Sequence, residues 1–167
     1  LLAHLGIARA VLLGHSLGGM TAMDLAPRSA RVAGLILAEG WTHLRAASQA
    51  FAPGRFHGQL PQPAIDAIMR KMKETMARFR PECWQHFWQS VEASDARAFL
   101  DTARIPVVPV YGEMGRTPRT EQMLDLPPAH RAAIRWIPDA GHYLPQEAPA
   151  LLARHTVDAL RHMAAGA

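Results

Sequence analysis

The sequence predicts an α/β protein with a mostly parallel sheet of about four strands flanked by helices. A continuous apolar run at residues 10–13 precedes a glycine-rich turn and a helix-type segment. A second apolar run follows at residues 32–38, so strand, helix and strand form one right-handed unit. Apolar residues in the middle of the chain recur at helical spacing instead, which indicates a helical insertion.

The outer parts of the chain supply the remaining elements of the sheet. Residues 1–5 read as the end of a helix, closed by Gly6. Residues 105–111 are the third predicted strand, in which Pro109 cannot donate to a ladder and predicts a bulge or an unpaired edge. Residues 134–137 are the fourth strand, and the final predicted helix is residues 149–163.

The sequence pattern between these parts is different. A proline-containing loop is followed by two or three segments with the apolar spacing of amphipathic helices. We therefore predict a core formed by residues 1–41 and 104–167, with residues 42–103 forming a helical cap or lid over it.

The stretch Gly14-His15-Ser16-Leu17-Gly18-Gly19 joins the first strand to its helix. A serine between glycines at a strand-to-helix joint is the G-x-S-x-G pattern of a nucleophile elbow, a strained turn that exposes the hydroxyl. We expect Gly14 and Gly18 to be needed because side chains there would collide. The helix starting after Ser16 would direct its free N–H groups at an oxyanion.

Composition excludes several classes of function. The chain has 167 residues, 49% of them hydrophobic, and a net charge of +4 from scattered arginines, so a nucleic-acid partner is not predicted. No apolar run has the length of a membrane span, and no signal peptide is evident. The single cysteine, Cys83, excludes an intramolecular disulfide and predicts a reducing, cytoplasmic location.

A serine needs a general base within hydrogen-bond reach. Of the nine histidines, His142 follows the end of the last predicted strand, in a loop that opens at the same sheet edge as Ser16. No histidine pair has the spacing of a helical zinc site, so we predict neither a metal nor a cofactor.

Together these stretches resemble the C-terminal two-thirds of an α/β-hydrolase-fold enzyme, with the helical insertion where that family carries its cap. The carrying residues are Leu5-Gly6-Ile7, residues 11–19, Ile105-Pro106-Val107, Gly112-Glu113, and Gly141-His142-Tyr143-Leu144-Pro145 with Glu147 and Pro149. The resemblance implies Ser16 as nucleophile, His142 as general base and acid, and the Leu17 N–H as an oxyanion donor.

The resemblance does not directly identify the acid of the triad, because Gly115 stands where family members commonly carry an aspartate. Glu39 ends the strand after the elbow helix, at the edge where α/β active sites form, and some relatives of the haloalkane-dehalogenase group take their acid from this strand. Glu39 is our choice, with a salt bridge to Arg45 or a helix cap as its non-catalytic alternative. Glu113, Asp139 and Asp125 stay open as other acids.

The predicted reaction is hydrolysis of a carboxylic ester, thioester or lactone with a small apolar acyl group. The substrate contacts that we expect are His15, Trp41, Met72, Trp84 and Trp88. The alternatives are a non-catalytic ligand-binding protein on a hydrolase scaffold, a carbon–carbon bond hydrolase, a perhydrolase or an acyltransferase.

The resemblance also implies parts that this sequence does not supply. In such enzymes a loop upstream of the elbow gives the second oxyanion donor, and further strands cover the strand at residues 10–13. We therefore expect a fragment of low activity, or an oligomer or missing segment that covers this edge, since losing one oxyanion donor typically costs about 10²–10³ in turnover.

Overall fold

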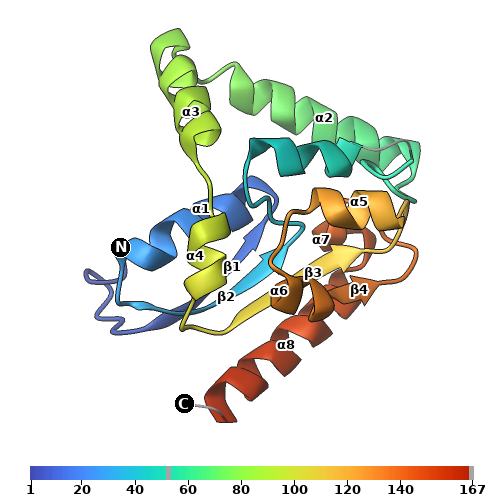
Figure 1. Cartoon of the computed structure of the whole chain (residues 1–167). Coiled ribbons are helices and arrows are strands. Elements are labelled where there is room, and N and C mark those ends of the chain that lie inside the picture. The colour runs from blue at the N-terminus through green and yellow to red at the C-terminus, as the bar shows by residue number, and fades with distance from the viewer. Residues whose placement is uncertain (52–53, 166–167) are drawn as a thin grey trace.

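The computed structural model describes residues 1–51 and 54–165 and contains one four-stranded sheet with helices on both faces (Figure 1). All three pairings are parallel, and the strands lie in chain order. They are β1 (Ala10–His15), β2 (Val32–Ala38), β3 (Val107–Gly112) and β4 (Arg135–Ile137). The prediction of about four parallel strands is therefore confirmed, with boundaries within two residues of those expected.

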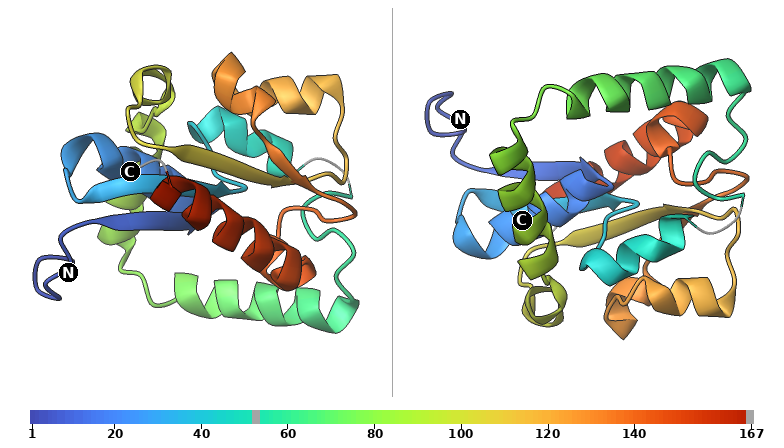
Figure 2. Two further views of the ribbon diagram at one scale, coloured as in Figure 1. Left: turned by 90° about the horizontal axis from the view of Figure 1, so that it is seen from below. Right: turned by 90° about the horizontal axis from the view of Figure 1, so that it is seen from above.

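Helices lie in every connection between the strands, and two more follow β4. In chain order they are α1 (Leu17–Leu25), η1 (Ala26–Arg28), η2 (Leu44–Phe51), α2 (Gln62–Met76), α3 (Pro81–Ala93), α4 (Arg97–Thr102), α5 (Pro118–Met123), α6 (Pro128–Ala132), α7 (Leu144–Glu147) and α8 (Pro149–Ala165). The views of Figure 2 show α8 running across one side of the strands, whereas α1 and α4 lie on the other.

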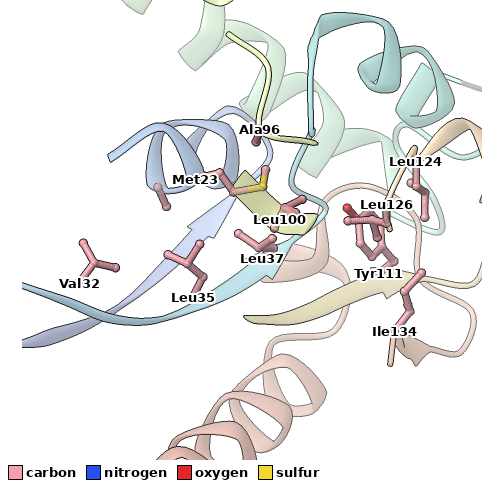
Figure 3. Packing of buried hydrophobic residues seen from close by; sticks show 11 residues of the cluster. Met23, Val32, Leu35, Leu37, Ala96, Leu100, Tyr111, Leu124, Leu126 and Ile134 are labelled. Carbon is pink, nitrogen blue, oxygen red and sulfur yellow. The ribbon is translucent and has the colours of Figure 1, made fainter. Parts of the chain in front are cut away.

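The alternation of side chains along β2 divides the core into two clusters, one on each face of the sheet. Leu35 and Leu37 point to the α1 face, where they pack with Met23, Leu100 and Tyr111 (Figure 3). The intervening residues Ile36 and Ala38 belong to the second cluster, which α8 covers with Leu152, Ala159 and Met163. Because β2 is buried on both faces, it reads as the continuous apolar run that the sequence shows.

Residues 2–6 form hydrogen-bonded turns and not the predicted helix, but the predicted closing residue is found at Gly6, whose φ of 68° is left-handed. Ile7 N–H donates to the Leu2 carbonyl at 2.9 Å and Gly6 N–H to that of Ala3 at 3.2 Å. This is the hydrogen-bond pattern of a Schellman helix end.

Of the two alternatives predicted at Pro109, the structure shows no bulge but does show an unpaired side of the strand. The β2–β3 register runs without a shift through Leu37 opposite Pro109. Glu113 N–H, four residues on and therefore on the same side of the strand, donates to Ile137 of β4. Pro109 thus turns its nitrogen toward the β4 side, where pairing starts only at Val110, so its missing N–H costs no ladder bond.

The strand that leads to Ser16 lies at the edge of the sheet. Its apolar residue Leu13 is 47% exposed, as expected for an uncovered edge. That a second copy or a further segment covers this edge stays a prediction.

The helices α2 and α3 form a layer above the carboxyl ends of the strands, away from α8 (Figure 1). No residue of α2 is buried, whereas Ala96 and Leu100, near and within α4, belong to the core cluster. The division into a core and a cap of residues 42–103 stays a prediction.

Glycines build the turn between β1 and α1, but the expectation that Gly18 is one of those required is wrong. A Cβ on Gly14 would lie 2.3 Å from the Gly18 carbonyl oxygen, and a Cβ on Gly19 would lie 2.7 Å from Gly40 Cα. A Cβ on Gly18 would meet nothing within 4 Å. Gly18 is therefore not needed for space, and Gly19 is, because it packs against the residue after Glu39.

We expect Gly14→Ala and Gly19→Ala each to destabilise the protein by about 1–3 kcal/mol or more, because backbone atoms must move to accommodate the methyl group. Gly18→Ala is the matched control and should leave stability unchanged or slightly raised, since alanine favours a helix. Urea unfolding of the three variants checks this. Equal losses in all three would contradict the packing argument.

Candidate active site

Ser16 occupies the joint between β1 and α1 in a backbone conformation that non-glycine residues rarely adopt. Its φ is 55° and its ψ is −122°. Its carbonyl accepts the Gly19 N–H at 2.9 Å, so the turn is closed by α1 itself. Leu17 is the first residue of α1, and its N–H has no carbonyl of a preceding turn to bond. The turn thus presents a hydroxyl and a free helix N-terminus side by side.

His142 and Glu39 lie in line behind this hydroxyl. His142 Nε2 is 3.0 Å from Ser16 Oγ, and His142 Nδ1 is 3.2 Å from Glu39 Oε2. Both side chains are buried, at 3% and 0% exposure. Glu39 follows β2 with a φ of 52°, and His142 follows β4, so the ends of three parallel strands bring the groups together.

The imidazole of His142 is enclosed by aromatic rings. It stacks on Trp41 at a centroid distance of 6.0 Å and on Phe56 at 5.6 Å, with interplanar angles of 18° and 16°. Tyr143 meets its edge at 5.6 Å. These contacts limit rotation of the ring away from Ser16 and Glu39.

The backbone around His142 is fixed by hydrogen bonds to three other residues. The Glu147 carboxylate accepts the N–H groups of Gly141 at 2.7 Å and Tyr143 at 2.9 Å, on either side of the histidine. His142 N–H donates to the Arg55 carbonyl at 3.0 Å. His15 Nε2–H donates to the His142 carbonyl at 2.7 Å. The loop therefore holds its shape without belonging to a helix or strand.

Arg55 is the cation that balances Glu39, and sequence reasoning missed it. Its Nη2 donates to Glu39 Oε1 at 2.6 Å, and it is 2% exposed. Arg45, the expected alternative partner, is exposed in η2. The sequence indicates only that Glu39 requires a partner, because a carboxylate at the end of an apolar strand is costly to bury alone. It does not indicate Arg55, which lies 16 residues away in a loop with no periodic pattern.

The other candidate acids point elsewhere. Glu113 pairs with Arg116 at 3.3 Å, and its side chain is 46% exposed. Asp125 accepts from His43 at 2.9 Å and from Arg97 at 3.0 Å, and the His43 hydrogen bond lowers the pKa of Asp125. Asp139 is exposed in the turn after β4.

A cavity of about 750 Å³ opens beside Ser16 under the helices α2 and α3. Trp41, Met72, Trp84 and Trp88, four of the five expected substrate contacts, line it together with Leu17. His15, the fifth, lies instead against the His142 ring at 5.1 Å between centroids. The structure therefore gives His15 a place in support of the histidine loop, in contrast to the expected contact with substrate.

Residues 1–51 and 54–165 show neither a metal site nor a membrane-spanning helix. No group of three His, Cys, Asp or Glu side chains in these residues could hold a metal ion. No helix formed by them is long and apolar enough to cross a bilayer.

A model of the Alpha/beta hydrolase family matches residues 1–155. The chain belongs to the alpha/beta hydrolase family. Membership of this family supports a hydrolase. A comparison with curated proteins found no match.

Solved structures of other alpha/beta hydrolases show the same fold at low identity. The enol-lactonase from Burkholderia xenovorans LB400 is 21% identical, with a TM-score of 0.66 over 96% of this chain and 68% of that one. Est816, described as an N-acyl homoserine lactone degrading enzyme, is 24% identical, with a TM-score of 0.67 over 94% and 70%. The proline iminopeptidase of Mycobacterium smegmatis is 20% identical, with a TM-score of 0.60 over 99% and 70%.

Because His15 is partly buried, we expect the free energy of unfolding to fall as the pH is lowered. Burial lowers the pKa of His15, although the hydrogen bond to the His142 carbonyl opposes this. The His15 imidazole therefore binds a proton less readily in the folded hydrolase than in the unfolded chain. The contribution of neutral His15 to stability is fully present above about pH 6.5 and is lost as the pH falls below it.

The variant His15→Gln keeps an N–H donor but does not titrate. Between about pH 7.5 and pH 5.5, we expect its free energy of unfolding in urea to fall less than that of the wild type. If both fall equally, His15 does not contribute to the acid sensitivity.

Proposed function

We propose that this hydrolase cleaves a carboxylic ester, thioester or lactone through an acyl-enzyme, with Ser16, His142 and Glu39 as its catalytic triad. The observation that carries the proposal is the line of hydrogen bonds from Ser16 Oγ through the imidazole to Glu39 Oε2. A nucleophile hydrogen-bonded to a base, with the base oriented by an acid, is the arrangement that activates a serine.

Each group has one role in the reaction. His142 Nε2 takes the Ser16 proton as Oγ attacks the carbonyl carbon. The oxyanion that forms accepts a hydrogen bond from the Leu17 N–H. His142 then gives the proton to the leaving alcohol or thiol. Water then attacks the acyl carbon as His142 Nε2 takes one of its protons. The acyl–Oγ bond breaks, His142 returns this proton to Ser16 Oγ, and the acid is released. Glu39 stays ionised throughout and stabilises the imidazolium.

The cavity supports an apolar acyl group. Its volume of about 750 Å³ is in the range of small-molecule sites, and aromatic and methionine side chains dominate its lining. Lys71 is the one charged side chain among the described residues that line it. This favours neutral or anionic substrates over cationic ones.

A fluorophosphonate probe tests the nucleophile directly. We expect the wild-type protein to be labelled and to hydrolyse p-nitrophenyl esters of medium-chain acids, because Ser16 is activated and accessible from the cavity. Ser16→Ala should lose both activities while its unfolding midpoint is retained. Absence of labelling in folded wild-type protein would instead indicate a scaffold that only binds a ligand.

Substitution of the acid separates Glu39 from its alternative. Glu39→Gln leaves an amide beside His142 that cannot stabilise the imidazolium, and we expect kcat to fall by roughly 10²–10⁴. Glu113→Gln is the matched control and should keep kcat within about twofold, since an exposed ion pair contributes little. Equal losses in kcat would remove Glu39 from the triad.

A further inference from the structure

Arg55 makes more hydrogen bonds around the proposed triad than charge balance with Glu39 requires. Its Nη1 donates to the carbonyls of Gly112 at 2.8 Å and Met114 at 2.5 Å, while Nη2 donates to Glu39. The guanidinium thus bridges the end of β3 and the residue that follows β2. A planar group with five donors can hold such a set of acceptors in one geometry.

The two oxygens of Glu39 have different partners. Oε1 accepts from Arg55 and from the Gly112 N–H, at 2.6 and 2.7 Å. Oε2 is bonded to His142 Nδ1 at 3.2 Å. The two short hydrogen bonds on Oε1 therefore determine the plane of the carboxylate and leave Oε2 directed at the imidazole.

The backbone of the same residue holds His142 from the other side. The Arg55 carbonyl accepts the His142 N–H at 3.0 Å. The two segments lie so close that a Cβ on Gly141 would be 2.1 Å from this carbonyl oxygen, and only glycine fits there. One residue therefore contacts the side chain of the acid and the main chain of the base.

We propose that Arg55 is a positioning residue that sets the acid–base geometry of the active site by fixing the Glu39 carboxylate against the His142 loop. This inference rests on the proposed triad. Arg55 acts through Glu39 and does not reach Ser16, so its loss should slow the chemical step and leave the apolar cavity intact. Misplacement of a catalytic group by about 1 Å can cost 10²-fold in rate.

A double-mutant cycle tests the inference, with kcat and KM measured on a medium-chain p-nitrophenyl ester. We expect Arg55→Met to lower kcat by about 10- to 100-fold and to keep KM within about threefold. In the Glu39→Gln background the same substitution should cost less than about threefold, because the carboxylate through which Arg55 acts is already gone. Equal costs in the two backgrounds would overturn the inference.

Arg55→Lys keeps the experiment informative where the methionine variant does not fold. Lysine retains the charge but cannot form the forked contacts, so we expect a folded protein with kcat lowered by about tenfold and KM unchanged. Full kcat in this variant, or failure of both variants to fold, would show that Arg55 serves stability only. Arg45→Met, at an exposed arginine of η2, is the matched control and should keep wild-type kcat.

The test of Arg55 can fail without contradicting the proposed function. Wild-type hydrolysis that Ser16→Ala abolishes establishes the nucleophile whatever Arg55 does. An active Arg55→Met variant then contradicts this inference alone. If wild-type protein shows no Ser16-dependent reaction, the proposed function fails first.

Discussion

The buried Glu39 carboxylate is the constraint on which the rest of this candidate active site depends. A carboxylate at 0% exposure is costly unless charge and hydrogen bonds compensate it, and Arg55 and the Gly112 N–H provide both. Their contacts occupy Oε1 and leave Oε2 for His142. The requirement to satisfy a buried charge and the requirement to orient an imidazole are thus met by one set of hydrogen bonds.

The parallel sheet makes this arrangement possible. The carboxyl ends of β1, β2 and β4 deliver Ser16, Glu39 and His142 to one edge, and β3 ends in Gly112, which donates to Glu39. A side chain on Gly112 would lie 2.2 Å from the Ala140 carbonyl oxygen, so the β3 end and the histidine loop touch through their backbones. Rigid strands determine where the residues emerge, and close-packed glycines determine how near they come.

The helices above the sheet serve a different purpose. Met69, Met76 and Phe79 are each 44% exposed, and no residue of α2 is buried, so this layer is held loosely compared with the sheet. Its apolar side lines the cavity beside Ser16. The segment after η2 that leads into α2 carries Arg55 and Phe56, both in contact with residues of the proposed triad. The helices that line the cavity and the residues that contact the proposed triad are therefore neighbours along the chain.

Local sequence determined the elements of this fold and most of the proposed triad. The apolar runs, the elbow glycines and the strand-end positions of Glu39 and His142 predicted parallel strands meeting at one edge, since short-range pattern and steric rules suffice for that. Arg55, the two N–H groups bonded to Glu147 and the role of Gly19 depended on tertiary structure alone. Their partners lie in other loops, and no periodicity records which irregular segment will reach a buried charge. The sequence shows that Glu39 needs a counterion, and only the folded chain decides that Arg55 provides it.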